Sequence, residues 1–174
     1  FAAHVIAVRV EAFTYLPAVA WAAATATMIG QALGAGNPER AKRCGHEAVL
    51  QCGLLSGVIT LAFFFGATAI YELMSADPLV RSTGAGPFRL LALFQPLLVV
   101  SIVYIGGLRG AGDTRFPLLI TIAGAILIRV PLGYLFGIAL DGGLLGAWVG
   151  MFGDITWRAA AATARYVHGA WVKT

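Results

Sequence analysis

The chain has 174 residues, of which 59% are hydrophobic and 11% charged, and its formal net charge is +4. Because soluble domains carry about 25% charged residues, this composition argues against a water-soluble fold and predicts an all-α integral membrane protein, a polytopic helical bundle. The basic residues are scattered through short turns and form no single patch, so we expect no nucleic-acid partner.

Five stretches are apolar and long enough to cross the lipid bilayer, which takes about 20 helical residues. We expect the corresponding helices at about 3–34, 48–71, 87–108, 116–140 and 142–164. Gly and Ala recur in most of these stretches, as is typical of helices that pack closely in lipid. The whole chain, residues 1–174, is therefore interpreted as one transmembrane unit with no soluble domain.

The first predicted helix carries a polar stripe. Helical spacing places Glu11 and Tyr15 on one face among small residues. Pro17 cannot donate a hydrogen bond to the carbonyl one turn before it, so the helix should bend there and leave an acceptor free. A carboxylate, an aromatic face and a bend together favour a cation-binding cleft. The alternative is that Glu11 pairs with Arg9 or Arg129, or lies in water at the interface.

A short phrase occurs twice where a long apolar run ends: residues 33–40 read LGAGNPER, and residues 108–115 read LRGAGDTR. Glycine accepts the left-handed backbone of a helix C-cap, and Asn or Asp can cap the helix that follows. Tight turns are therefore predicted at Gly34, Gly36, Gly110, Gly112 and Asp113. Both turns carry basic residues, which places them in the cytoplasm by the positive-inside rule. The N-terminus would then be external and the C-terminus cytoplasmic.

The third predicted helix repeats the combination of a polar group and a bend, with Gln95 directly before Pro96. The same helix offers Ser101 and Tyr104. We take Gln95 and Tyr104 as further residues of the cleft.

Three ionisable residues lie within the last two predicted spans, where each costs about 2.5–3.5 kcal/mol at the centre of the bilayer. Asp154 and Arg158 have the i,i+4 spacing of an ion pair. Arg129 needs carboxylates or free carbonyls as partners, and Pro131, two residues later, predicts a third bend. We interpret Arg129, Asp154 and Arg158, together with Arg9, as a structural charge clamp.

Motifs of enzymes and metal sites are absent from the sequence. The two cysteines and three histidines show no ligand spacing, and no nucleotide-binding loop or nucleophile motif occurs. We expect a protein that is not an enzyme and binds no metal or cofactor.

Taken in order, the motifs resemble the C-terminal half of the multidrug and toxic compound extrusion (MATE) family. They are residues 9–11, 30–36, 77–78, 95–96, 108–114, 129–132, 143–148 and 165–171. The resemblance implies twelve transmembrane helices in two six-helix lobes around a central cleft. On that template the chain is a fragment that supplies five helices of the C-terminal lobe, and its partners are the lipid bilayer and the N-terminal lobe of the same protein.

The resemblance also implies a function, the export of small organic cations in exchange for H⁺ or Na⁺. We expect such a multidrug antiporter in a bacterial inner membrane, with Glu11 as the cleft carboxylate of this half. One alternative is a flippase for lipid-linked oligosaccharides or lipid precursors from the same wider superfamily. Its cleft should gather several basic residues at membrane depth, whereas only Arg129 meets that description, with Arg158 nearer the inner end and expected to be paired. Another is a non-transporting membrane scaffold, which would not need kinked helices with polar stripes.

Overall fold

The computed structural model describes residues 2–173, and every regular element in this range is helical. The first three elements are long helices, α1 (Ala2–Gly34), α2 (Pro38–Met74) and α3 (Pro78–Gly110). The next four follow without a break: α4 (Arg115–Ala123), the π-helical η1 (Gly124–Arg129), α5 (Val130–Tyr134) and the π-helical η2 (Leu135–Ala139). The last two are α6 (Gly143–His168) and the 3₁₀-helical η3 (Ala170–Lys173).

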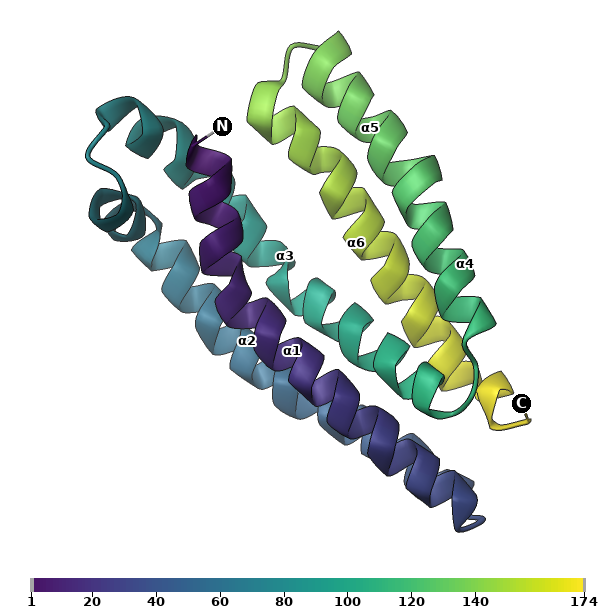
Figure 1. Ribbon diagram of the computed structural model, residues 1–174. Coiled ribbons are helices and arrows are strands. Elements are labelled where there is room, and N and C mark those ends of the chain that lie inside the picture. Colours follow the sequence, from purple (N-terminus) through teal and green to yellow (C-terminus); the bar gives the residue numbers. More distant parts are fainter. Residues whose placement is uncertain (1, 174) are drawn as a thin grey trace.

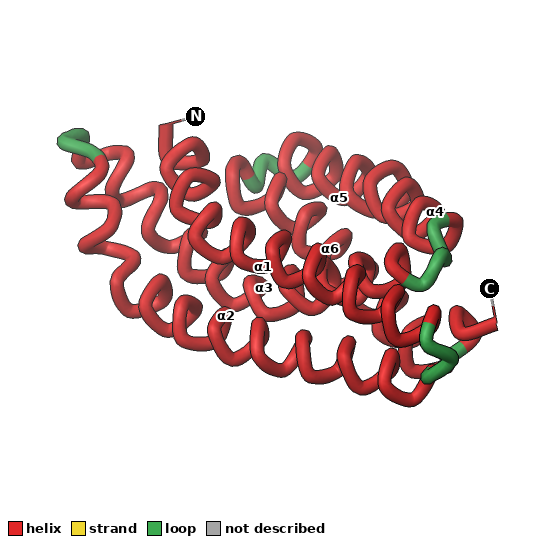
Figure 2. Tube along the Cα trace, turned by 60° about the horizontal axis from the view of Figure 1, so that its bottom comes forward, coloured by secondary structure: helices red, strands yellow, loops and turns green. Residues whose placement is uncertain are grey.

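The helices form two groups that meet along α3 (Figures 1 and 2). Helices α1, α2 and α3 pack against one another, and the α4–α5 helix packs against α6, which also packs against α3. The predicted all-α bundle is therefore confirmed.

Four helical segments are long and apolar enough to cross a membrane: Ala2–Gly34, Pro38–Met74, Pro78–Gly110 and Arg115–Ala139. Large apolar side chains cover their outer faces, with Phe65 78% and Leu127 71% exposed, as expected for surfaces that face lipid. Among the described residues, α6 is less apolar than these four and contains Asp154 and Arg158. That α6 also spans the membrane stays a prediction.

Two helices begin earlier than the predicted positions 48 and 87, and these two boundaries were wrong. The side chain of Asn37 accepts a hydrogen bond from the Arg40 N–H at 2.9 Å, which caps α2 ahead of Pro38. Asp77 caps α3 in the same way through the Leu79 N–H at 2.8 Å. Hydropathy detects the apolar part of a helix, whereas these helices start at polar caps outside it.

The two glycine-rich turns have the predicted geometry, with positive φ angles of 70° at Gly36 and 88° at Gly112. Gly34 and Gly110 lie at helix ends and differ in how closely another helix approaches them. A Cβ on Gly110 would overlap the backbone carbonyl of Ala26 in α1, so this glycine lets α1 and α3 approach closely. At Gly34 a Cβ would meet nothing within 4 Å.

Aromatic side chains join the helices at both ends of the bundle. Near the N-terminus, the Tyr71 hydroxyl donates to the Ala3 carbonyl at 2.7 Å, and Trp148 Nε1 donates to His4 Nδ1 at 3.2 Å. At the other end, the Tyr166 hydroxyl donates to the Ala41 carbonyl at 3.0 Å. The Trp148 and Tyr166 contacts join α6 to α1 and α2 at opposite ends of the bundle, and the Tyr71 contact joins α2 to α1.

Candidate functional site: a polar cleft between the helix groups

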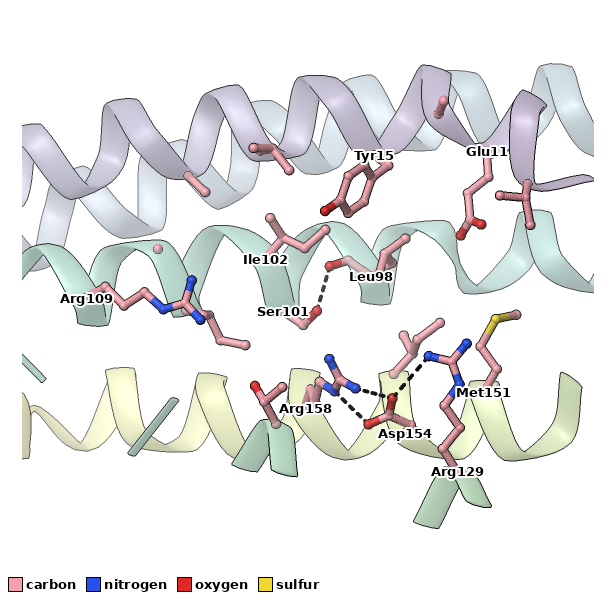
Figure 3. A pocket seen from close by; sticks show the side chains of 18 residues that line it. Glu11, Tyr15, Leu98, Ser101, Ile102, Arg109, Arg129, Met151, Asp154 and Arg158 are labelled. Atoms are coloured by element: carbon pink, nitrogen blue, oxygen red, sulfur yellow. Dashed lines mark hydrogen bonds and ion pairs between the residues drawn. The ribbon is translucent and has the colours of Figure 1, made fainter. Parts of the chain in front are cut away.

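A cleft of about 700 Å³ separates α1 and α3 from η1 and α6 (Figure 3). Most of its wall is apolar, but two carboxylates and three guanidinium groups reach it. The polar and charged lining residues are Glu11, Tyr15, Ser101, Arg109, Thr121, Arg129, Asp154 and Arg158. Ionisable groups gathered around an opening in a membrane protein indicate a functional site.

The predicted stripe of α1 faces this cleft, since Glu11 and Tyr15 both line it one helical turn apart. Gln95 of α3 lies behind them and is 1% exposed. Its Nε2 donates to Glu11 Oε1 at 3.3 Å, so Gln95 positions the carboxylate without lining the cleft. Its own Oε1 is buried without a hydrogen-bond partner among the described residues.

Glu11 forms no ion pair within residues 2–173, although Arg129 and His4 lie within electrostatic range of it. The pairing with Arg9 or Arg129 that the sequence left open is therefore not formed. The carboxylate has a neutral hydrogen-bond donor and remains accessible from the cleft.

Asp154 is the centre of a charge cluster on the opposite wall. Its carboxylate receives Arg158 Nε at 2.6 Å and a second, short contact from Arg158 Nη2, which makes the pair bidentate. Arg129 Nη1 lies 3.9 Å from Asp154 Oδ2. Asp154 is 1% exposed, and Gly124 leaves room for its carboxylate against η1. The predicted pairing of Asp154 with Arg158 is present, and Arg129 joins it.

Two sequence predictions about this site were wrong. Arg9 is exposed on α1 and forms no ion pair among the described residues, so it takes no part in the clamp. Tyr104 does not line the cleft, because it lies on the side of α3 that faces α2 and α6, where its hydroxyl is 2.9 Å from His46 Nδ1. Residue spacing shows which side chains share a helix face, but it does not show which face lines the cleft. That depends on how the neighbouring helices pack.

The three predicted bends fall on three different helices. Pro17 lies within α1 and Pro96 within α3, and both helices change direction along their length in Figure 1. Pro131 lies in α5, the short α-helical piece between the two π-helical segments. Wider π-helical turns often mark functional positions, and here η1 ends at Arg129.

Sequence reasoning missed Arg109 and Thr121 as cleft residues. Arg109 belongs to the second glycine-rich phrase, and the sequence predicted it only as a basic residue of a cytoplasmic turn. In the structure it lines the cleft from the last turn of α3. Thr121 gave no signal, because threonine is common in apolar helices. Within residues 2–173, no three His, Cys, Asp or Glu side chains come together as a metal site.

Comparison with known proteins gives consistent similarities. The MatE family model matches residues 1–135. A probable multidrug resistance protein NorM of Thermotoga maritima is 28% identical over 173 residues, which is 99% of this chain and 37% of that protein. The multidrug and toxin extrusion protein 1 of Danio rerio is 28% identical over 155 residues, 88% of this chain and 26% of that protein. The chain thus spans between about a quarter and a little more than a third of the length of these relatives.

Solved structures share the fold. The eukaryotic MATE transporter AtDTX14 superposes with a TM-score of 0.91 at 20% identity, over 99% of this chain and 38% of that one. An inward-facing multidrug resistance MATE family transporter of the MOP superfamily gives a TM-score of 0.78 at 21% identity, over 94% of this chain and 37% of that one. The two helix groups described above are thus an arrangement found in transport proteins.

Proposed function

The chain belongs to the MatE family of multidrug efflux transporters, and from this membership we propose that it contributes to an ion-coupled antiporter exporting organic cations. It is a multi-pass membrane protein. The proposed location is a bacterial inner membrane, with the two glycine-rich turns in the cytoplasm. An N-terminal lobe of the same protein is the proposed partner that completes the transport path.

The observation that carries this proposal is the Glu11 carboxylate, which lines the cleft without an ion-pair partner among the described residues. A carboxylate in a partly dehydrated opening attracts cations strongly, because water screens its charge less there. The aromatic face of Tyr15, next along the same wall, suits an organic cation.

In the proposed mechanism, Glu11 binds either the coupling ion or the organic cation, so that one displaces the other. Rocking of the two lobes would expose the cleft to alternate sides of the membrane. Pro17, Pro96 and Pro131 are the proposed bending points, since each interrupts the backbone hydrogen bonds of its helix.

The test uses accumulation of ethidium in cells that express the full-length protein, with imposed H⁺ or Na⁺ gradients. We expect Glu11→Gln to abolish ion-driven export and Glu11→Asp to retain part of it. Glu47→Gln is the matched control, because Glu47 is exposed on α2 outside the cleft. Unchanged export and unchanged ion dependence in Glu11→Gln would show that the role proposed for Glu11 is wrong.

Cation export is better supported than the two alternatives. A flippase for lipid-linked oligosaccharides would need several free basic residues, but Arg129 and Arg158 are both engaged by Asp154, and Arg109 is then the only cleft arginine without an acidic partner among the described residues. A scaffold would not need a polar cleft of this size. Failure to export ethidium together with transport of a lipid-linked oligosaccharide would reverse this order.

A further inference from the structure

One pair of side chains joins α1 to α6 at the end of the bundle where both helices begin (Figure 1). Trp148 Nε1 donates to His4 Nδ1 at 3.2 Å, and the centroids of the two rings lie 5.9 Å apart. Among residues 2–173 this is the one side-chain hydrogen bond between α1 and α6. His4 lies one turn before Val8, the first cleft residue of α1. Trp148 lies three residues before Met151, the first cleft residue of α6, so the pair bridges the two walls directly beyond the cleft.

The hydrogen bond between these rings requires a neutral histidine. An indole N–H can only donate, so His4 must accept with the lone pair of Nδ1 and carry its proton on Nε2. A second proton would occupy Nδ1 and set two N–H donors against each other. The bond would then be lost, and the buried indole N–H of Trp148 would lose its acceptor.

A second histidine contact in the bundle behaves differently. His46 Nδ1 lies 2.9 Å from the hydroxyl of Tyr104. A hydroxyl group can both donate and accept a hydrogen bond, so this contact persists when the histidine ring gains a proton. The contact of His4 with an indole does not, because the indole nitrogen has no lone pair to offer.

The elements around His4 carry few titratable groups that face it. Glu11, two turns further along α1, lies within electrostatic range of His4. On α2, Tyr71 donates its hydroxyl to the backbone of α1 beside it. Helices α3 and α6 contribute Phe88 and Trp148 to the buried cluster at this end, and neither side chain titrates. Of these residue types, histidine is the one that ordinarily changes charge near neutral pH.

We propose that His4 is a proton-binding site that controls access to the cleft. While the ring is neutral, its bond to Trp148 holds the first turns of α1 and α6 together and closes this end. When His4 binds a proton, the bond breaks and the two helices separate, because α1 packs mainly on α2 and α3, and α6 on α3 and the α4–α5 helix. In the proposed topology this end is external, so acid outside the membrane would open it. The site lies apart from Glu11 and goes beyond the proposed export function.

The test measures the distance between α1 and α6 by pulsed electron paramagnetic resonance in the purified full-length protein. Spin labels are attached to Phe13→Cys on α1 and Leu145→Cys on α6, two exposed positions, with the native cysteines replaced. We expect the population with the longer distance to rise about three- to tenfold between about pH 8 and about pH 5.5, the range in which histidine gains its proton. This change corresponds to the loss of one hydrogen bond between the helices.

Four variants separate this bond from other effects of pH. His4→Gln should stay closed at both pH values, since its amide oxygen accepts from the indole without titrating. Trp148→Phe should be equally open at both, because it has no N–H to donate. His46→Gln is the matched control and should respond as the wild type does. Glu11→Gln should also keep the response, which separates this result from the export assay.

The proposal is overturned if the wild-type distance does not change with pH, or if His4→Gln changes as the wild type does. A response that is lost in Glu11→Gln and kept in His4→Gln would assign the movement to the export carboxylate instead. Should either His4→Gln or Trp148→Phe not fold, the other variant decides by its own loss of pH dependence.

Discussion

Replacing Asp154 by Asn tests whether the charge clamp stabilises the bundle. The Asp154 side chain is 2% exposed and holds Arg158 bidentately, while Arg129 lies 3.9 Å away. The variant keeps the shape of the side chain but leaves two guanidinium groups without a counter-charge. Removing one partner of a fully buried pair costs about 3–5 kcal/mol.

The expected loss is smaller here, because the two arginines are not fully buried. Arg158 is 24% and Arg129 53% exposed, and water compensates part of their charge. We therefore expect Asp154→Asn to lower the free energy of unfolding by about 2–3 kcal/mol. Asp141→Asn is the control, because Asp141 is an exposed acid at the turn between η2 and α6.

A double-mutant cycle with Arg158→Gln isolates the pair. Unfolding of the full-length protein in mixed micelles is followed by tryptophan fluorescence, since Trp157 lies on α6 directly before Arg158. The double variant should be more stable than Asp154→Asn alone, because it removes one of the uncompensated charges, with a coupling energy of about 1–3 kcal/mol. Additive losses, or an Asp154→Asn variant as stable as the wild type, would refute the clamp.

Three further variants test contacts outside this cluster by the same unfolding measurement. Gly110→Ala should lower the free energy of unfolding by about 1–3 kcal/mol, because its Cβ would overlap the backbone of α1. Gly34→Ala should leave the free energy of unfolding unchanged, and equal effects of the two variants would contradict close packing at Gly110. Tyr71→Phe should cost about 1 kcal/mol, because the buried hydroxyl donates to a backbone carbonyl of α1, and no loss would argue against that bond. Tyr104→Phe removes a contact with His46 and should leave ethidium export unchanged; loss of export at normal stability would return Tyr104 to the transport path.

The cleft face of α1 could be predicted from sequence, but that of α3 could not. The stripe of α1 stands out because Glu11 and Tyr15 are the polar and aromatic residues of an otherwise small-residue face. Helix α3 packs against α1, α2 and α6, so polar and apolar residues occur all around it. Ser101 faces the cleft while Tyr104, three residues later, faces His46, and only the positions of the neighbouring helices distinguish the two.

The bend at Pro131 illustrates a different limit. The sequence indicates that proline interrupts the backbone hydrogen bonds, but it does not show how the helix responds. Here the chain winds more widely on both sides, in η1 and η2, and remains one continuous helix. Helix α6 packs closely against this stretch, because Gly146 and Gly150 leave no space for a Cβ next to the backbone of residues 129–137.

The second glycine-rich phrase connects the turn to the cleft. Gly112 meets the need for a positive φ angle, and Gly110 permits the contact with Ala26 of α1. Consecutive helical residues point about 100° apart, so the contact at Gly110 turns Arg109 away from α1. Its guanidinium group consequently reaches the cleft that α6 closes on the other side. The glycine-rich phrase that predicts a turn thus also orients Arg109, the one cleft arginine without an acidic partner among residues 2–173.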